Sequence, residues 1–226
     1  MKMMKAILKF VFFFWIDLFL LFFKRNKRLV VCTGWGGKRF ADNSRYMYLY
    51  LTEHKLQYKI EDVIWITQDL LIKENLEKAG YKVYMKNSWR SFYYHLHAYY
   101  FFYDQFKKDY FYRLLRKARL INLWHGMPIK KFGTKTGLVW ILKDDYLFTC
   151  SSWGDDMIGA SFIANPKRFI HGMYPRNYYL TNPIPFLTEE ERSYLLQIRK
   201  QKEKGKKIVF YLPTFRKSKL MFLGES

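Results

Sequence analysis

The sequence predicts an α/β fold built on a parallel β-sheet, and three observations support this. From residue 29 onward, short runs rich in β-branched and aromatic residues alternate with longer runs of helical periodicity. The chain has 226 residues, which is long enough to bury a substantial core. Hydrophobic residues make up 50% of it and aromatic residues 21%, more apolar surface than a disordered chain exposes. Strands that alternate with helices form a parallel sheet with crossover helices.

The strands and helices can be assigned in order along the chain. Seven runs have the length and composition of strands: 29–33, 62–67, 81–85, 119–123, 146–150, 169–171 and 207–212. Helical patterns occupy 44–54, 70–79, 89–104, 155–163 and 189–204. Gly80 and Gly205 directly follow two of these helices, as is typical of helix ends. Ligands of such sheets bind at the carboxyl ends of strands, so the loops after strands are the candidate functional segments.

The charge of the chain restricts its partners. Lys and Arg number 40 against 19 Asp and Glu, a formal net charge of +21. This excess favours a negatively charged partner, which nucleic acid, anionic lipid or a phosphorylated substrate would provide. The two cysteines, Cys32 and Cys150, lie in apolar strand-like runs without the spacing of metal ligands. We expect both thiols to be buried and reduced.

Residues 1–28 are predicted to form a membrane-associating amphipathic helix. The apolar run from Phe10 to Phe23 is interrupted only by Asp17 and is shorter than the roughly 20 residues that a spanning helix needs. On a helical wheel the polar side chains share one sector: Lys2, Lys5, Lys9, Asp17 and Lys24. This pattern favours a helix lying in the plane of an anionic membrane surface. A signal peptide, a tilted span and a helix buried against the protein are the alternatives.

Two of the candidate loops follow strands 29–33 and 119–123. The first contains three glycines, whose spacing is not that of a dinucleotide-binding loop, followed by Asp42 and Asn43. A turn with one of these two residues as helix N-cap is the simpler explanation. The second loop reads WHGMPIKK and places His125 at a strand end. An imidazole there could take a proton from an attacking hydroxyl, and Lys130 and Lys131 could neutralise phosphate charge. A structural histidine bonded to a loop carbonyl is the alternative.

The other two loops follow strands 169–171 and 207–212. Arg176 and Asn177 lie in GMYPRNYYL, and Thr214 and Arg216 lie in PTFR. A guanidinium beside a polar side chain at a strand end suits an anionic group. Each loop by itself fits an ordinary polar turn equally well.

Five segments, in this order, carry a family resemblance: FADNSRYMYLYL, VIWIT, LINLWHGMPIKK, GMYPRNYYL and IVFYLPTFR. Over residues 29 to about 216 the sequence resembles the CDP-glycerol glycerophosphotransferases. The resemblance implies two Rossmann-like domains in a GT-B arrangement, peripheral on the cytoplasmic face of the bacterial cell membrane. It also implies the synthesis of teichoic acid or related wall or capsule polymers. The implied reaction transfers glycerol phosphate from CDP-glycerol to a hydroxyl of a lipid-linked polyol-phosphate or glycan acceptor and releases CMP, without cofactor or metal.

The resemblance also implies roles for individual residues. The histidine of the family's WHG motif falls on His125, which would activate the acceptor hydroxyl. The implied substrate-binding residues are Asp42, Asn43, Lys130, Lys131, Arg176, Asn177, Thr214 and Arg216. The family's PRND motif reads PRNY here, so Tyr178 stands in place of an acidic residue.

Three segments are expected: the membrane-associating residues 1–28, a Rossmann-like acceptor-side domain at 29–185, and a linker helix with the start of a donor-binding domain at 186–226. A GT-B enzyme needs two domains of about 150 residues, so the resemblance implies a truncated donor domain and an inactive chain. The alternatives are another polyol-phosphate transferase, such as a ribitol phosphate transferase, a nucleotide-sugar transferase on the same scaffold, and a non-catalytic basic module that binds membrane surfaces. Nucleic acid is disfavoured because no recognised binding motif accompanies the aromatic and basic residues of 89–116.

Overall fold

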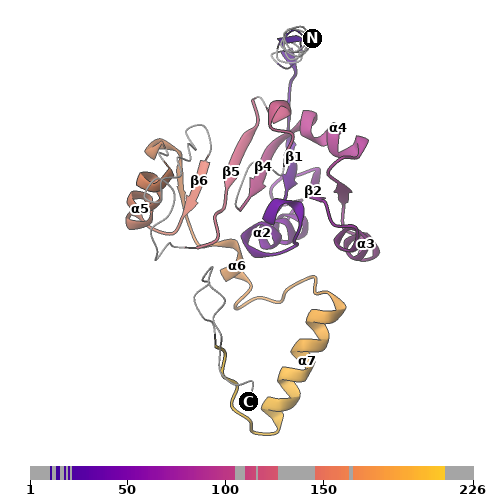
Figure 1. Cartoon of the computed structure of the whole chain (residues 1–226), viewed down its shortest axis with the longest axis vertical. Coiled ribbons are helices and arrows are strands. Elements are labelled where there is room, and N and C mark those ends of the chain that lie inside the picture. The colour runs from indigo at the N-terminus through magenta and orange to yellow at the C-terminus, as the bar shows by residue number, and fades with distance from the viewer. Residues whose placement is uncertain are drawn as a thin grey trace, which may run out of the picture. The chain divides into compact units, whose positions relative to one another are not determined.

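The structure is a computed structural model that describes residues 11, 14–15, 18, 20, 22–104, 110–115, 117–126, 146–162 and 165–211. The chain divides into two compact units, residues 1–186 and 187–226. Within the first unit, helices surround a central parallel sheet (Figure 1). In the part of the chain that the structure describes, no helix has the length and apolar content needed to cross a membrane.

The sheet has seven strands in the order β3-β2-β1-β4-β5-β6-β7, and every neighbouring pair is parallel. Its strands are β1 (Asn26–Cys32), β2 (Asp62–Thr67), β3 (Val83–Met85), β4 (Ala98–Tyr103), β5 (Arg119–Asn122), β6 (Tyr146–Thr149) and β7 (Phe169–His171). The order reverses between β1 and β4, as in doubly wound, Rossmann-like sheets. The predicted α/β class with a parallel sheet is confirmed.

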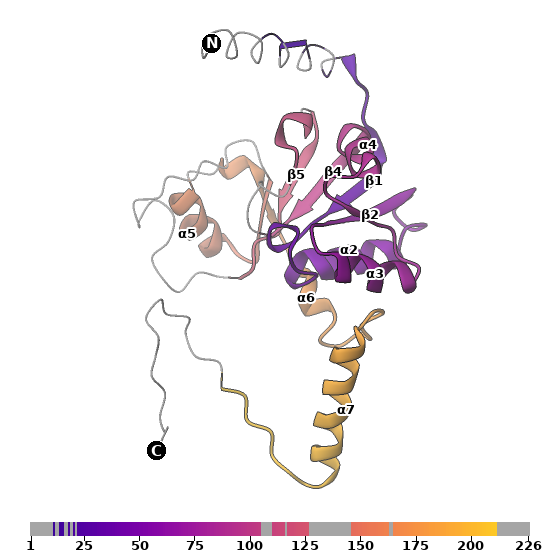
Figure 2. The ribbon, with the colours of Figure 1, turned by 45° about the vertical axis from the view of Figure 1, so that its right-hand side comes forward.

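Alternating side chains of the strands build a core on each face of the sheet. One face packs against α2 (Asp42–Glu53) and α3 (Leu70–Lys78), and the other against α4 (Trp89–His97) and η3 (Tyr112–Leu115). Figure 2 shows α2 and α3 close together and α4 away from them. On the α2 side the buried strand residues include Val30, Cys32, Val63 and Trp65, and on the α4 side Leu29, Val31, Ile64 and Ile66. This period of two is why both faces of β1 and β2 are apolar.

Among the remaining helices that the structure describes, α5 (Ser152–Phe162) and, in the second unit, α7 (Glu189–Glu203) are long. The other three are single turns: η1 (Trp35–Gly37), η5 (Pro166–Arg168) and α6 (Pro175–Tyr178). A capping box begins α7, since the Thr188 hydroxyl accepts the N–H of Glu191 while the Glu191 carboxylate accepts that of Thr188. Gly80 and Gly205 have φ of +81° and +75° after α3 and α7, so both helices end as predicted.

Two predicted elements are wrong. The helix expected at 89–104 ends at His97, and Ala98 leads directly into β4. Aromatic residues suit helices and strands alike, but AYYFFY lies beside β1 in the sheet, where Ala98, Phe101 and Tyr103 are buried. The strand expected at 207–212 is absent over residues 206–211, which are exposed and have no neighbouring strand among the described residues.

The prediction of two buried thiols is correct for one cysteine only. Cys32 is fully buried in β1, and burial raises the pKa of its thiol. Cys150 is exposed because β6 ends at Thr149 and the chain turns outward toward α5.

Two polar side chains, those of Arg25 and His95, are buried in the core beside α4. Arg25 is 9% exposed, and its guanidinium donates to the carbonyl oxygens of His95 (2.9 Å), Ala98 (2.6 Å) and Leu114. His95 is fully buried, and its Nδ1 lies 2.7 Å from the carbonyl oxygen of Ser91. Its ring packs against the rings of Phe101, Tyr110 and Phe111.

We expect His95 to make the protein sensitive to acid. Burial lowers the pKa of His95 from its ordinary value of 6.5 to about 4, and the positive charges of Lys86 and Arg25 act in the same direction. As the pH falls, the imidazole of His95 is protonated in the unfolded chain before it is protonated in the folded protein. The contribution of the neutral ring to the free energy of unfolding is therefore fully present above pH 6.5. Roughly 3 kcal/mol of it is lost as the pH falls toward 4. Urea unfolding at pH 7 and pH 4 measures this loss.

A variant without the imidazole isolates the effect. His95→Phe should be less stable at pH 7 but should lose roughly 3 kcal/mol less than the wild-type protein between pH 7 and pH 4. The matched control is His97→Phe, two residues further along α4, where the side chain is only half-buried. Equal losses in the wild-type protein and His95→Phe would contradict the prediction.

Candidate functional site

The candidate site lies at the carboxyl ends of β1, β4 and β5, where the strand order of the sheet reverses. Past the end of β1, the N–H of Thr33 donates to the carbonyl oxygen of Phe102 at 3.1 Å. The N–H of Trp35 donates to Oδ1 of Asp104 at 3.1 Å. Asp104 directly follows β4 and is fully buried. These contacts join the glycine-containing loop after β1 to the end of β4.

His125 is held by the loop that follows β5. Asn122, the last residue of β5, accepts the N–H of Trp124 through its side-chain oxygen at 2.9 Å. Nδ1 of His125 lies 3.3 Å from the carbonyl oxygen of Asp104. A carbonyl oxygen can only accept, so this contact assigns the ring proton to Nδ1 and leaves Nε2 as a proton acceptor. An imidazole in this tautomer can take a proton from a hydroxyl that approaches Nε2.

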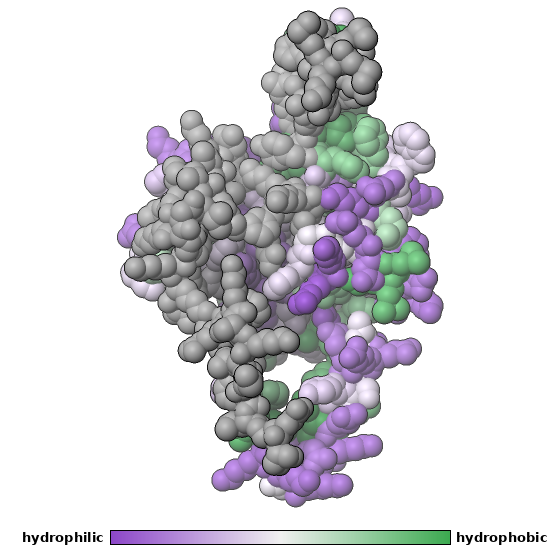
Figure 3. All heavy atoms as spheres, viewed as in Figure 1, coloured by the Kyte–Doolittle hydropathy of each residue, from purple (hydrophilic) through white to green (hydrophobic). Residues whose placement is uncertain are grey.

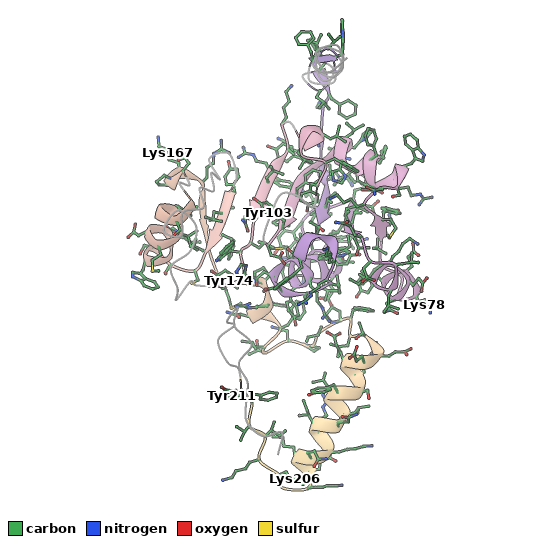
Figure 4. The ribbon with its side chains drawn as sticks, viewed as in Figure 1. Lys78, Tyr103, Lys167, Tyr174, Lys206 and Tyr211 are labelled. Carbon is green, nitrogen blue, oxygen red and sulfur yellow. The ribbon has the colours of Figure 1, made fainter. Side chains whose placement is uncertain are left out.

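Asn43 connects three segments that are distant in sequence. Its side chain is fully buried, and its Nδ2 donates to the carbonyl oxygen of Trp124 at 2.7 Å. Its Oδ1 accepts the N–H of Arg176 at 3.4 Å. The guanidinium of Arg176 forms an ion pair with Asp42 at 2.9 Å. Figure 4 labels Tyr174, the residue that precedes α6, at the edge of the sheet where these segments meet.

The explanation of Asp42 or Asn43 as an N-cap is therefore wrong. Ala41 occupies the N-cap position of α2, and no side chain caps this helix. Both side chains are directed to other segments, Asn43 to the loop after β5 and Asp42 to α6. The lack of a side chain at Gly126 leaves room for Arg176 beside that loop, because a Cβ at position 126 would lie 3.2 Å from Nη2 of Arg176.

Three of the five residues other than glycine that have positive φ in the described part of the chain lie around the site. Trp35, Asp42 and Trp124 have φ of 49°, 58° and 49°, in the left-handed region that side chains disfavour. Each such conformation costs about 1–3 kcal/mol and persists only where its surroundings enforce it. Gly34 packs closely at the site, because a Cβ there would lie 3.0 Å from Oδ2 of Asp104 and 3.3 Å from the Trp65 ring. Such concentration of strain is typical of functional sites.

A known protein family matches most of the chain. The model of the CDP-Glycerol:Poly(glycerophosphate) glycerophosphotransferase family matches residues 16–225. The chain belongs to this family. The predicted resemblance is thus confirmed.

Two curated relatives are identical to this chain at about a quarter of the aligned positions. A teichoic acid poly(glycerol phosphate) polymerase of Bacillus spizizenii is 26% identical over 217 residues, which cover 89% of this chain and 53% of the relative. A teichoic acid glycerol-phosphate transferase of Staphylococcus aureus is 24% identical, with 84% and 51% covered. The chain therefore spans about half the length of these relatives. The solved wall teichoic acid polymerase TagF shares the fold, with a TM-score of 0.65, 20% identity, and 89% of this chain and 51% of that chain covered.

The structure brings together four of the residues to which the family resemblance assigns roles: Asp42, Asn43, His125 and Arg176. Asn177 lies next to Arg176 in α6. The guanidinium of Arg176 is paired with Asp42, and 39% of its side chain is exposed. The remaining predicted residues lie outside the described part of the chain: Lys130, Lys131, Thr214 and Arg216. Among the residues that are described, no group of three His, Cys, Asp or Glu side chains could hold a metal ion.

Sequence reasoning missed two parts of the site. Asp104 orients Trp35 through its carboxylate and His125 through its carbonyl oxygen. Its signal is its place directly after a run of strand-forming residues, which is visible only when AYYFFY is assigned as a strand. The second omission is the carbonyl oxygen of Trp124, the acceptor for Asn43, and a backbone atom leaves no signal in the sequence.

We expect Asn43→Ala to destabilise the protein by about 1–3 kcal/mol. The substitution leaves the buried carbonyl of Trp124 and the N–H of Arg176 without the partner that Asn43 provides, and unpaired buried polar groups carry a cost of this size. Urea unfolding at pH 7 measures the change. Asn26, whose amide donates to Glu61 in an exposed pair, is the matched control, and Asn26→Ala should change stability by less than about 0.5 kcal/mol. Similar stabilities of the two variants would contradict this role for Asn43.

Proposed function

We propose that this chain forms the acceptor-side half of a CDP-glycerol glycerophosphotransferase of teichoic acid or related polymer synthesis. The observation that carries the proposal is the position of His125 at the carboxyl end of β5, with Nδ1 directed to the carbonyl oxygen of Asp104. Family membership supports the reaction type, because the matching family is described as transferring to poly(glycerophosphate). The related chains are a polymerase and a transferase of teichoic acid.

In the proposed reaction His125 acts as the general base. Nε2 accepts the proton of an acceptor hydroxyl as the hydroxyl oxygen attacks the phosphorus of CDP-glycerol that carries the glycerol. A new phosphorus–oxygen bond forms to the acceptor, the bond between that phosphorus and the bridging oxygen breaks, and CMP leaves with the electron pair. Asn43 and Asp104 hold the loop and the ring in place, so that the base does not have to be oriented during the reaction.

The substrates follow from the same proposal. The acceptor is a hydroxyl of a lipid-linked polyol phosphate or glycan, and residues Lys130, Lys131, Thr214 and Arg216 contribute cations and a hydroxyl to anionic groups. The net charge of +21 supports a polyanionic acceptor. CDP-glycerol is proposed as the donor on the ground of family membership, with most of its site in the second domain of a GT-B arrangement.

We also propose that residues 1–28 attach the protein peripherally to the cytoplasmic face of the membrane. Phe14 and Trp15 are more than half exposed, which is unusual for two neighbouring large apolar side chains. Basic residues that follow, from Lys24 to Arg28, suit anionic headgroups. Arg25 is the exception among them, because it is buried.

Acceptor-dependent release of CMP tests the proposed reaction. The chain is joined to the C-terminal half of the Bacillus spizizenii relative, which supplies most of the donor site, and incubated with CDP-glycerol in the presence and absence of a glycerol phosphate acceptor. We expect CMP release only in the presence of acceptor. Absence of acceptor-dependent CMP release, in a chimaera that folds, would contradict the proposal.

A further inference from the structure

Helix α4 exposes several large aromatic side chains, although a helix that packs only against a sheet normally buries such side chains. Its buried positions are Ser91 and His95, both without solvent exposure. Its exposed aromatic positions are Trp89, Phe92 and Tyr93, which are 87%, 40% and 49% exposed. Positions 89, 92 and 93 share one side of a helix, so these rings form a single aromatic stripe. The stripe is larger than the scattered apolar residues found on most protein surfaces.

The stripe continues toward the segment that precedes β1. The ring of His97 stacks on Tyr93 with centroids 3.9 Å apart, and its edge meets the ring of Phe23 at 4.9 Å. Phe22, the neighbouring residue, is 84% exposed. Figure 3 shows hydrophobic residues gathered where α4 lies, above more hydrophilic residues. We call the side chains of Phe22, Phe23, Trp89, Phe92 and Tyr93 the aromatic face.

Only positive charges accompany the aromatic face in the sequence. No Asp or Glu occurs between Glu77 and Asp104, or between Asp17 and Asp42. Exposed cations lie in both segments: Lys24, Lys27 and Arg90. A protein partner would need an acidic and apolar surface to match, whereas an anionic bilayer presents both properties everywhere along its interface. Trp, Tyr and Phe beside basic residues are typical of segments that lie at the headgroup level.

We propose that the aromatic face inserts into the headgroup region of an anionic lipid bilayer, with Trp89, Phe92 and Tyr93 of α4 as a second contact that adds to residues 1–28. The choice of partner rests on the proposed membrane association, but the contact does not rest on the proposed reaction. Helix α4 leads into the amino end of β4, whereas His125 follows the carboxyl end of β5. Phe22 and Phe23 precede the amino end of β1, so this part of the aromatic face lies at the opposite edge of the sheet from the candidate site. Substitutions in the aromatic face leave the residues around His125 unchanged.

Vesicle partitioning of the 226-residue chain tests the proposal. The double variant Trp89→Ser/Phe92→Ser should reduce partitioning into vesicles of phosphatidylglycerol and phosphatidylcholine by about 10-fold or more, because two large rings no longer leave water. The matched control is Trp153→Ser/Leu71→Ser, which removes two exposed apolar side chains from α5 and α3. The control should partition like the wild-type protein. Circular dichroism should show that both variants fold.

A local probe gives a second readout. In a Cys150→Ser background, Phe92→Cys is labelled with an environment-sensitive nitrobenzoxadiazole dye, whose emission should rise and shift to the blue on anionic vesicles. The same dye at Trp153→Cys should not change. Unchanged emission at position 92, or unchanged partitioning of Trp89→Ser/Phe92→Ser, would overturn the proposal. Loss of self-association in that variant without loss of partitioning would overturn it in favour of a second copy of the chain.

The experiment also separates this inference from the membrane association on which it rests. The variant Phe14→Ser/Trp15→Ser removes exposed rings from residues 1–28 only. Reduced partitioning of that variant, with full partitioning of Trp89→Ser/Phe92→Ser, would leave the first contact standing and exclude the second. Failure of the wild-type chain to bind anionic vesicles would exclude both contacts, and CMP release in solution would still report on the proposed reaction.

Discussion

Replacing His125 with alanine is expected to lower the turnover of the chimaeric transferase by about 10²–10⁴-fold, the usual contribution of a general base. The expectation follows from the contact of Nδ1 with the carbonyl oxygen of Asp104, which leaves Nε2 to receive the proton of the acceptor hydroxyl. In free energy of activation this range is about 3–5 kcal/mol. Initial rates of CMP release at saturating CDP-glycerol measure it.

A second substitution distinguishes a base from a structural histidine. Asparagine at position 125 can donate its amide N–H to the carbonyl oxygen of Asp104, as Nδ1 does, but it has no basic nitrogen. If His125 is the base, His125→Asn stays as inactive as His125→Ala while its thermal stability recovers. If the bond to Asp104 is the only function of the ring, His125→Asn recovers activity, and that result would contradict the proposed role. His54→Ala, at the C-cap of α2, is the control, and its turnover should equal that of the unsubstituted chimaera.

Most of the fold could be predicted because its signals are local. The runs that become β1 and β2 alternate apolar side chains on two faces, and Gly80 and Gly205 end two helices by adopting positive φ. The run from Trp89 to Asp104 has no such local marker. Its aromatic residues satisfy both helical and extended backbones, and no glycine or proline stands at Ala98, where α4 becomes β4. Pairing with β1 and β5 selects the strand, and those partners are distant in sequence.

The candidate site was predictable to a similar degree. His125 and Asn43 could be singled out because motifs of the family fall on them. What the motifs could not reveal is the hydrogen bond from Asn43 to the carbonyl oxygen of Trp124, 81 positions away. Asp104 was not predicted as a site residue because residues 89–104 were assigned to a helix. A residue inside a predicted helix is not considered as the end of a strand. A single misassigned element thus removed one of the residues that orient the imidazole.

Arg25→Met is expected to lower the free energy of unfolding by about 3 kcal/mol. The buried guanidinium donates to carbonyl oxygens of α4, β4 and η3, and hydrogen bonds from a charged donor contribute about 1.5–3 kcal/mol each. Removing the charge also removes the cost of its burial, which lowers the pKa of Arg25 to about 10. The loss dominates, because methionine fills the space but leaves the carbonyl oxygens of His95, Ala98 and Leu114 without this donor.

The expected change is large enough to read from thermal unfolding. For a chain of this length, 3 kcal/mol corresponds to a fall of about 6–12 °C in Tm. Arg28→Met is the matched control, because Arg28 is exposed and its guanidinium makes one 3.3 Å contact with the carbonyl oxygen of Lys59. Its Tm should change by less than about 2 °C. Arg25→Lys, which keeps the charge but not the fork of donors, should fall between the two. Equal Tm values for Arg25→Met and Arg28→Met would mean that the buried guanidinium makes no net contribution to stability, and would contradict the prediction.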